Sequence, residues 1–142
     1  MKTANWGEQE KELVADRSRD WLAQARRDLE QAEDSSRAGR HEWACFAAHQ
    51  AAEKAAKALL LWLRQEPWGH VVARLLQELP VEAAAPAALV EKARFLDNLY
   101  VPTRYPNGHP EGAPFEHYGP LQSELALAYA REIIEFVRSK MA

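Results

Sequence analysis

The stretch EWACFAAHQAAEKAAKALL, residues 42–60, decides the fold class of this chain of 142 residues. It is rich in alanine, which has the highest helix propensity and lets neighbouring helices approach closely. We therefore predict a helix over residues 42–65, ended by Pro67 and Gly69, at the centre of a helical bundle. Its apolar residues at helical spacing are Trp43, Phe46, Ala47, Ala51, Ala55, Ala58, Leu59 and Trp62.

Four further segments show apolar residues at helical spacing. The predicted helices cover residues 9–37, residues 70–79, residues 86–100 and residues 120–141. The second of them is short and is ended by a proline. The residues predicted to form the apolar faces are Trp21, Leu22, Ala25, Leu29 and Ala32; Val71, Leu75 and Leu79; Leu89, Ala93 and Leu96; and Leu121, Leu125, Ala128, Tyr129, Glu132, Ile133 and Phe136, flanked by Leu127 and Ile134.

The overall composition agrees with a helical domain. The chain contains 26 alanines and only 11 valine, isoleucine and threonine residues together. Since β-branched residues favour strands, this balance predicts an all-α fold. Hydrophobic residues make up 47% of the chain and charged residues 27%, which is typical of a globular protein of one domain. We expect a single helical domain over residues 1–142, with residues 1–8 as a flexible N-terminal tail.

The segment from residue 101 to residue 119 breaks the helical pattern. Pro102, Pro106, Pro110 and Pro114 recur every four residues, with glycines among them. A proline removes a backbone donor and clashes with the preceding turn, so this segment cannot form a continuous helix. Loops of this length in a small domain are uncommon and usually functional. The predicted fold is an antiparallel four-helix bundle with an extra short helix and a long proline-rich loop before the last helix.

Charge and cysteine content exclude several classes of function. A net charge of −3 argues against nonspecific wrapping of duplex nucleic acid, although a local basic cleft is compatible with it. Because Cys45 is the only cysteine, an intrachain disulfide and a cysteine-rich zinc site are excluded. No histidine and carboxylate cluster has the spacing of a metal site, so we expect no metal or other cofactor. The pattern shows neither a signal peptide nor a membrane span, and we expect a cytoplasmic protein.

Arg104 and His109 are the candidate catalytic pair. A guanidinium group suits phosphate, and histidine side chains move protons near neutral pH. Together they suffice for RNA cleavage without a metal, since histidine can deprotonate the ribose 2′-hydroxyl while arginine stabilises the charge of the transition state. The alternative is structural, because this spacing also occurs by chance. In that case Arg104 fixes the loop through backbone carbonyls and His109 is solvated.

Several segments, in the same order, resemble the HEPN domain family. Residues 42–60 resemble its signature second helix, residues 21–32 its first helix, and residues 70–76 its short third helix, which contains a histidine. Residues 96–106, which run from Leu-Asp to Thr-Arg-Tyr-Pro, are similar to another characteristic segment of the family. The resemblance covers about residues 21–137.

Membership of that family implies a small helical bundle that forms a homodimer. Many members are metal-independent endoribonucleases and toxins of toxin–antitoxin pairs, with a motif of arginine, four to six residues and histidine. Arg104 and His109 match this spacing, and the resemblance implies that two copies of the pair meet at the dimer interface. It also implies RNA or a nucleotide as ligand, and a minimal nucleotidyltransferase as partner. Because Tyr105 stands where active members typically have a polar residue, the alternative is a nucleotide-binding or interaction module without catalysis.

The residues predicted to bind RNA or a nucleotide are Arg104, Tyr105, Lys57 and His70. For His70, the alternative is a structural hydrogen bond. Lys57 belongs to a polar strip on the second predicted helix that either satisfies carbonyls of the proline-rich loop, which we favour, or faces a ligand. Within this strip Glu53 and Lys57 are four residues apart, which favours an ion pair. The strip consists of Gln50, Glu53, Lys54 and Lys57.

Overall fold

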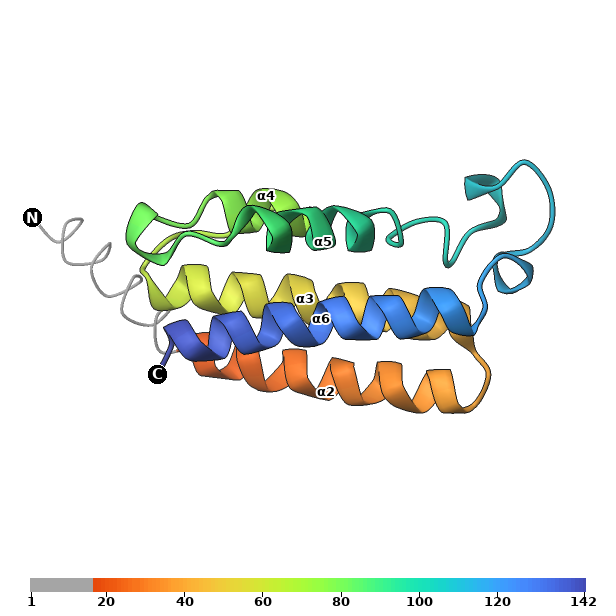
Figure 1. The fold of residues 1–142 in the computed structure, drawn as a ribbon, viewed down its shortest axis with the longest axis horizontal. Helices are drawn as coiled ribbons and strands as arrows, with labels where there is room; N and C mark the ends of the chain where they lie inside the picture. The colour runs from red at the N-terminus through yellow and green to blue at the C-terminus, as the bar shows by residue number, and fades with distance from the viewer. Residues whose placement is uncertain (1–16) are drawn as a thin grey trace, which may run out of the picture.

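The structure, a computed structural model, describes residues 17–142, so the predicted tail and the beginning of the first predicted helix lie outside the described residues. The predicted all-α fold is confirmed: residues 17–142 contain no strand. The α-helices are α2 (Ser18–Arg37), α3 (His41–Trp62), α4 (Val72–Gln77), α5 (Ala87–Asp97) and α6 (Pro120–Lys140) (Figure 1). Three short 3-10 turns are η1 (Val81–Ala83), η2 (Pro106–Gly108) and η3 (Pro114–Glu116). No helix in this part of the chain is long and apolar enough to cross a membrane.

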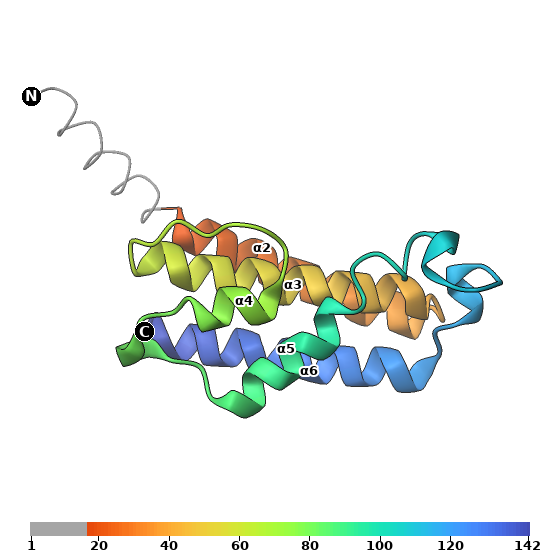
Figure 2. The same ribbon diagram turned by 90° about the horizontal axis from the view of Figure 1, so that it is seen from above.

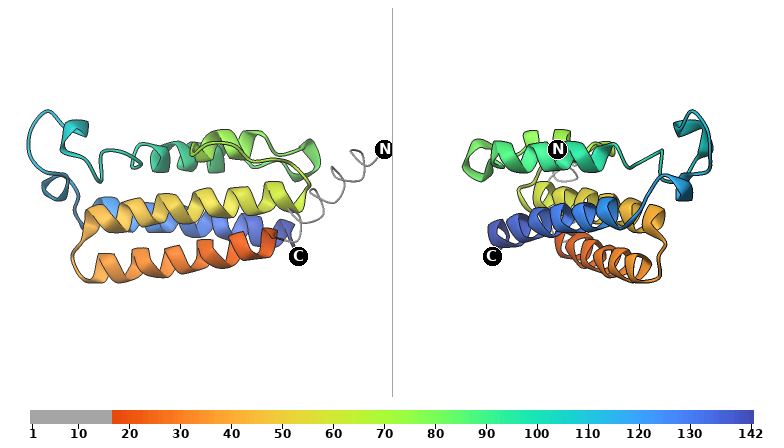
Figure 3. Two further views of the ribbon diagram at one scale, coloured as in Figure 1. Left: turned by 180° about the vertical axis from the view of Figure 1, so that it is seen from behind. Right: turned by 45° about the vertical axis from the view of Figure 1, so that its right-hand side comes forward.

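The helices form a bundle in which α3 and α6 lie in the middle. In Figure 1, α2 lies below this pair and α4 and α5 lie above it, and Figure 2 shows α5 crossing over α6. Along the chain, α3 runs opposite to α2, α5 runs opposite to α3, and α6 runs opposite to α5. Consequently α3 and α6 run in the same direction and pack against each other. The proline-rich loop projects at the end of the bundle where α2 connects to α3, as both views of Figure 3 show.

Alanine allows the close packing around α3, as the sequence predicts. This helix contacts α2, α4, α5 and α6, and its alanines at positions 51, 52, 55 and 58 are fully buried. Ala126 and Ala130 of α6, and Ala25 and Ala32 of α2, are also fully buried. Helices with such small residues at their contacts approach closely enough to exclude water without long side chains between them.

Several predicted apolar faces are wrong in detail. Leu121 is 76% exposed and Leu125 is 36% exposed, and Ala128 also faces solvent. Val71 precedes α4 and is exposed, and Trp43 on α3 is half exposed. The reason in α6 is that apolar residues lie on more than one side of the helix, and the side with small residues packs closest to α3. The buried residues of α6 are Ser123, Ala126, Leu127, Ala130, Ile133, Ile134 and Val137.

The last residue of α5, Asp97, holds the start of α4. Its Oδ1 accepts a hydrogen bond from the backbone N–H of Val72 at 2.7 Å, and its Oδ2 accepts one from Ala73 at 3.0 Å. Nε2 of the fully buried His49 lies 3.3 Å from Asp97 Oδ1 and 3.1 Å from the carbonyl oxygen of His70. One carboxylate therefore connects three elements, α3, α4 and α5, and satisfies donors that otherwise have no partner at a helix start.

Cys45 on α3 gives the stability of the protein a specific dependence on pH. Burial, with a smaller contribution from the Glu42 carboxylate, raises the pKa of this thiol from 9.0 to about 12. In the unfolded chain the thiol ionises near its ordinary value, whereas in the folded protein it stays protonated. The unfolded state therefore binds fewer protons above pH 9, and stability falls as the pH rises.

We expect the free energy of unfolding to fall by about 1 kcal/mol more between pH 9 and pH 10 in the unchanged protein than in Cys45→Ala. Urea unfolding curves of the two proteins at pH 8, 9 and 10 measure this difference. Parallel pH profiles would show that the thiol does not contribute.

Candidate functional site

The first part of the proline-rich loop is a hydrogen-bonded turn that fixes the position of Arg104. The backbone N–H groups of Arg104 and Tyr105 donate to the carbonyl oxygen of Val101 at 3.0 and 3.2 Å. The buried Thr103 hydroxyl donates to the carbonyl oxygen of Leu99 at 2.6 Å. Because this turn follows α5 directly, the Arg104 side chain lies back against the bundle rather than in free solvent.

Three aromatic rings surround the guanidinium group of Arg104. Its Cζ lies 4.2 Å from the centre of the Phe46 ring on α3 and 4.7 Å from that of Tyr100. The third ring, Tyr105, is 5.1 Å away. The Arg104 Nε donates a hydrogen bond to the carbonyl oxygen of Tyr100 at 2.9 Å. This bond is of the structural kind predicted for Arg104, and it uses one of the five N–H groups of the side chain. Within residues 17–142 the two terminal nitrogens of Arg104 make no hydrogen bond or ion pair.

His109 has partners of its own within the loop. Its Nε2 donates to the carbonyl oxygen of Pro102 at 2.7 Å, and its ring stacks on that of His117 with centres 4.0 Å apart. Gly108 permits this close approach, since a Cβ there would lie 2.9 Å from Pro102 Cα. Among the described residues no hydrogen bond or ring contact joins His109 to Arg104. In the described part of one chain the candidate catalytic pair is therefore not in direct contact, and His109 is hydrogen-bonded within the loop rather than solvated.

His70 lies beside the Arg104 site. Its imidazole ring stacks on the Tyr100 ring, with centres 5.1 Å apart and planes inclined by 16°. Its Nδ1 lies 3.1 Å from both carboxylate oxygens of Glu53, which is 4% exposed. The predicted structural hydrogen bond of His70 therefore exists. The His70 side chain itself is 56% exposed, so the bond also fixes an imidazole at the surface.

The polar strip of α3 does not face the proline-rich loop, and the favoured prediction for it is wrong. Lys57 Nζ lies 3.3 Å from Glu53 Oε2, which confirms the predicted ion pair, and Lys54 Nζ lies 2.5 Å from Asp28 Oδ2 on α2. The loop satisfies carbonyls with its own side chains, as Arg104 and His109 show. The Lys57 side chain is 12% exposed and its charge is paired, which makes it a poor phosphate ligand.

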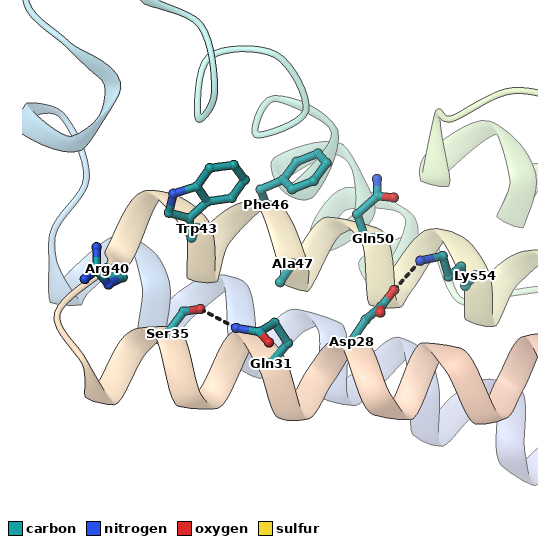
Figure 4. A pocket seen from close by; sticks show the side chains of 9 residues that line it. All are labelled: Asp28, Gln31, Ser35, Arg40, Trp43, Phe46, Ala47, Gln50 and Lys54. Atoms are coloured by element: carbon teal, nitrogen blue, oxygen red, sulfur yellow. Dashed lines mark hydrogen bonds and ion pairs between the residues drawn. The ribbon is translucent and has the colours of Figure 1, made fainter.

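A groove between α2 and α3 adjoins the Arg104 site. Its cavity has a volume of about 420 Å³, and Phe46, which contacts the Arg104 guanidinium, forms part of its wall. Figure 4 shows Trp43, Phe46 and Gln50 extending from α3, with the side chains of α2 across the groove from them. The groove thus combines two aromatic rings with amide, hydroxyl and charged groups. The polar residues that line it are Asp28, Gln31, Ser35, Arg40, Gln50 and Lys54.

Sequence reasoning missed the aromatic residues that hold Arg104. Phe46 is predicted above as an ordinary core residue, and Tyr100 only as the end of a helix. A local signal exists for Tyr100, because it precedes Arg104 by four residues and a single turn places such residues side by side. No local signal exists for Phe46, since it reaches Arg104 only through the packing of α3 against the loop.

Comparisons with known proteins all indicate the same family. The model of the HEPN domain matches residues 18–140. A protein from Thermus thermophilus with a crystal structure shares 49% sequence identity with this chain. The two structures have a TM-score of 0.86, and the match covers 87% of this chain and 98% of that one. An archaeal HEPN homologue is 38% identical, with a TM-score of 0.76, and the match covers 88% and 98% of the two chains. A HEPN domain protein from Thermotoga maritima is 32% identical, with a TM-score of 0.69 and coverage of 84% and 95%. No curated protein matches the chain.

Proposed function

The chain belongs to the HEPN domain family, and on that premise we propose that it binds single-stranded RNA through a phosphate contact at Arg104. The observation that supports this proposal most is the fixed guanidinium group. Phe46, Tyr100 and the Nε hydrogen bond hold it in place, while its terminal nitrogens are free of partners among residues 17–142. Such an arginine is ready to donate two parallel hydrogen bonds to a phosphate without losing side-chain freedom on binding.

The surroundings of Arg104 favour a single strand over a duplex. Tyr105 is 51% exposed and Trp43 is 50% exposed, and the groove beside Phe46 is lined by further polar groups. Unpaired bases stack on exposed aromatic rings and are held by hydrogen bonds to their edges, whereas duplex binding requires a broad basic surface. The net charge of −3 does not provide such a surface.

Replacement of Arg104 by glutamine is expected to weaken RNA binding by at least about tenfold, the scale of one hydrogen-bonded charge contact. Fluorescence anisotropy of a labelled single-stranded RNA at fixed salt concentration measures the dissociation constants. A labelled nucleoside triphosphate in the same assay tests the alternative ligand, a free nucleotide.

The matched control is Arg94→Gln, because Arg94 on α5 is exposed and already paired with Glu91. This variant should bind as the unchanged protein does. Equal affinities of Arg104→Gln and Arg94→Gln, with circular dichroism showing both folded, would contradict a phosphate contact at Arg104. A weaker dependence of the dissociation constant on salt concentration in Arg104→Gln, but not in Arg94→Gln, would further support the phosphate contact.

A catalytic role for His109 has less support than RNA binding. The Nε2 atom of His109 is engaged by Pro102, and no contact joins its ring to Arg104 within the described chain. The geometry therefore favours the binding module over a ribonuclease that uses this pair within one chain. The roles as a toxin and as partner of a minimal nucleotidyltransferase stay predictions of the family resemblance.

We also propose that the protein forms a two-fold symmetric homodimer through the end of the bundle that carries the proline-rich loop. Large apolar side chains are exposed there: Phe115 in the loop is 66% exposed, and Leu121 in the first turn of α6 is 76% exposed. Large exposed apolar side chains gathered at one end of a fold are typical of protein–protein contacts, and two-fold pairing is the commonest way to cover them.

The double substitution Leu121→Asp with Leu125→Asp is expected to convert the dimer into a monomer, because it places charges in a contact that excludes water. Multi-angle light scattering at micromolar concentration measures the mass. The control is Val81→Asp, since Val81 is 88% exposed and η1 lies at the other end of the bundle. A monomeric unchanged protein, or a double variant that stays dimeric, would contradict this interface.

A further inference from the structure

We propose that a second cavity, between the start of α2 and the end of α3, binds a small ligand with a flat apolar body and a single carboxylate group. The cavity has a volume of about 530 Å³, which suits a small organic molecule. None of the residues that line it contacts Arg104. The site is therefore distinct from the Arg104 surface, and the proposal does not rest on RNA binding there.

Two indole rings provide the apolar part of this cavity. Trp21 comes from α2, and Trp68, from the segment after α3, is 72% exposed and has no aromatic or cation partner among residues 17–142. Trp62 nearby in the chain is different, because the Arg19 guanidinium covers its ring at 5.3 Å. A flat ring that stacks on the indoles removes the exposed surface of Trp68 from water, which favours an aromatic ligand.

Lys57 provides the polar part of the cavity. Its side chain is only 12% exposed, and its Nζ lies 5.7 Å from the centre of the Trp21 ring and 3.3 Å from Glu53 Oε2. Among residues 17–142 this ammonium group makes no hydrogen bond, although it carries three N–H donors. A ligand oxygen in the cavity can accept one of them in a place that is largely shielded from water, where such a bond is strong.

The charges around the cavity select a ligand with one negative charge. Lys57 and Arg17 bring two cations to the lining against one carboxylate, that of Glu66, so an anion is favoured. Both cations also have a carboxylate partner behind them: Arg17 Nε donates to Asp20 at 2.7 Å, and Lys57 is paired with Glu53. A group with two or more negative charges, such as a phosphate, meets repulsion from these carboxylates. An organic cation is disfavoured as well, because Lys57 already lies against the Trp21 ring.

The test uses the full chain and 2-naphthoate, an aromatic monocarboxylate, as the probe. Isothermal titration calorimetry at neutral pH measures its dissociation constant and the number of molecules bound per chain. We expect one molecule per chain. The uncharged 2-naphthylmethanol, which has the same ring system, should bind at least about tenfold more weakly, the scale of one charge-assisted hydrogen bond. The cationic 2-naphthylmethylamine should bind more weakly still.

Substitutions then assign the two parts of the site. Lys57→Met keeps the aliphatic chain and removes the ammonium, so it should weaken 2-naphthoate binding at least about tenfold and leave binding of the alcohol unchanged. The matched control is Lys92→Met, because Lys92 Nζ is also paired with a carboxylate, that of Glu132, and lies 5.6 Å from the Tyr129 ring, but does not line this cavity. Trp68→Ala should weaken both probes by about fivefold or more, the scale of one aromatic contact.

The outcomes that would overturn the proposal are specific. Absence of 2-naphthoate binding at millimolar concentration would show that the cavity does not take this class of ligand. Equal affinity for the acid and the alcohol, or a preference for the amine, would remove the carboxylate from the assignment. Equal effects of Lys57→Met and Lys92→Met would place the binding elsewhere. If circular dichroism shows that Lys57→Met does not fold, the comparison of the three probes and the exposed position Trp68→Ala decide the question.

Discussion

The substitution Asp97→Ala is expected to lower the free energy of unfolding by about 3 kcal/mol, because this one side chain on α5 holds donors of two other helices, α3 and α4. Its carboxylate accepts hydrogen bonds from the backbone N–H groups of Val72 and Ala73 at the start of α4. It also lies 3.3 Å from Nε2 of His49, which is fully buried. Alanine removes all of these acceptors at once and leaves the N–H groups in a partly buried place.

Chemical denaturation of Asp97→Ala, with circular dichroism as the signal, measures this loss. In Asp97→Asn one oxygen acceptor and the shape remain, so we expect a smaller loss, of about 1 kcal/mol. The control for the removal of a carboxylate is Asp34→Ala, because Asp34 is exposed on α2 and is paired with Arg37 of the same helix. That variant should stay within about 0.5 kcal/mol of the unchanged protein. Equal stability of Asp97→Ala and Asp34→Ala would show that α4 does not depend on this carboxylate.

The second large effect is expected from Ala55→Leu in the middle of α3. Ala55 is fully buried in the core that α3 shares with its neighbouring helices. Leucine adds three carbon atoms where the helices are already in contact, so the helices must separate or the side chain must take a strained rotamer. Overpacking of this kind costs roughly 1–3 kcal/mol, and we expect the upper half of that range.

The matched control for Ala55→Leu is Ala128→Leu, since Ala128 lies on α6 and faces solvent. Leucine and alanine both favour helices, so this variant should unfold within about 0.5 kcal/mol of the unchanged protein. Thermal unfolding of both variants, followed by circular dichroism, gives the comparison. An unchanged melting temperature in Ala55→Leu would mean that the centre of the bundle has space that the structure does not show.

The sequence predicts the helices and the loop well where a single compositional feature is strong. Alanine density places α3 at the centre of the fold, and the prolines after residue 100 mark the loop. The buried side of α6 is predicted less well, because leucines such as Leu121 occur outside it and local periodicity cannot rank the faces. The start of α4 shifts to Val72 for a tertiary reason. No capping residue precedes it in the chain, and the cap comes from Asp97, 25 residues later.

The candidate site shows the same division between local and tertiary information. Arg104 can be identified from its chemistry and from the family resemblance, and the Glu53–Lys57 pair from its spacing. The contact of Phe46 with Arg104 and that of Glu53 with His70 join residues that are far apart in the chain. They exist because α3 passes beneath both the segment before α4 and the turn after α5, which no local pattern encodes.

Cys45 provides a way to measure the fraction of molecules in which the bundle is open. Because the folded protein keeps this single thiol buried and protonated, an alkylating reagent added near neutral pH can modify it only in molecules that have opened around α3. The rate of alkylation then reports the population of open molecules without any denaturant. A ligand that binds only the closed bundle slows alkylation in proportion to its occupancy. The thiol therefore lets binding at the Arg104 surface be titrated without labelling the RNA.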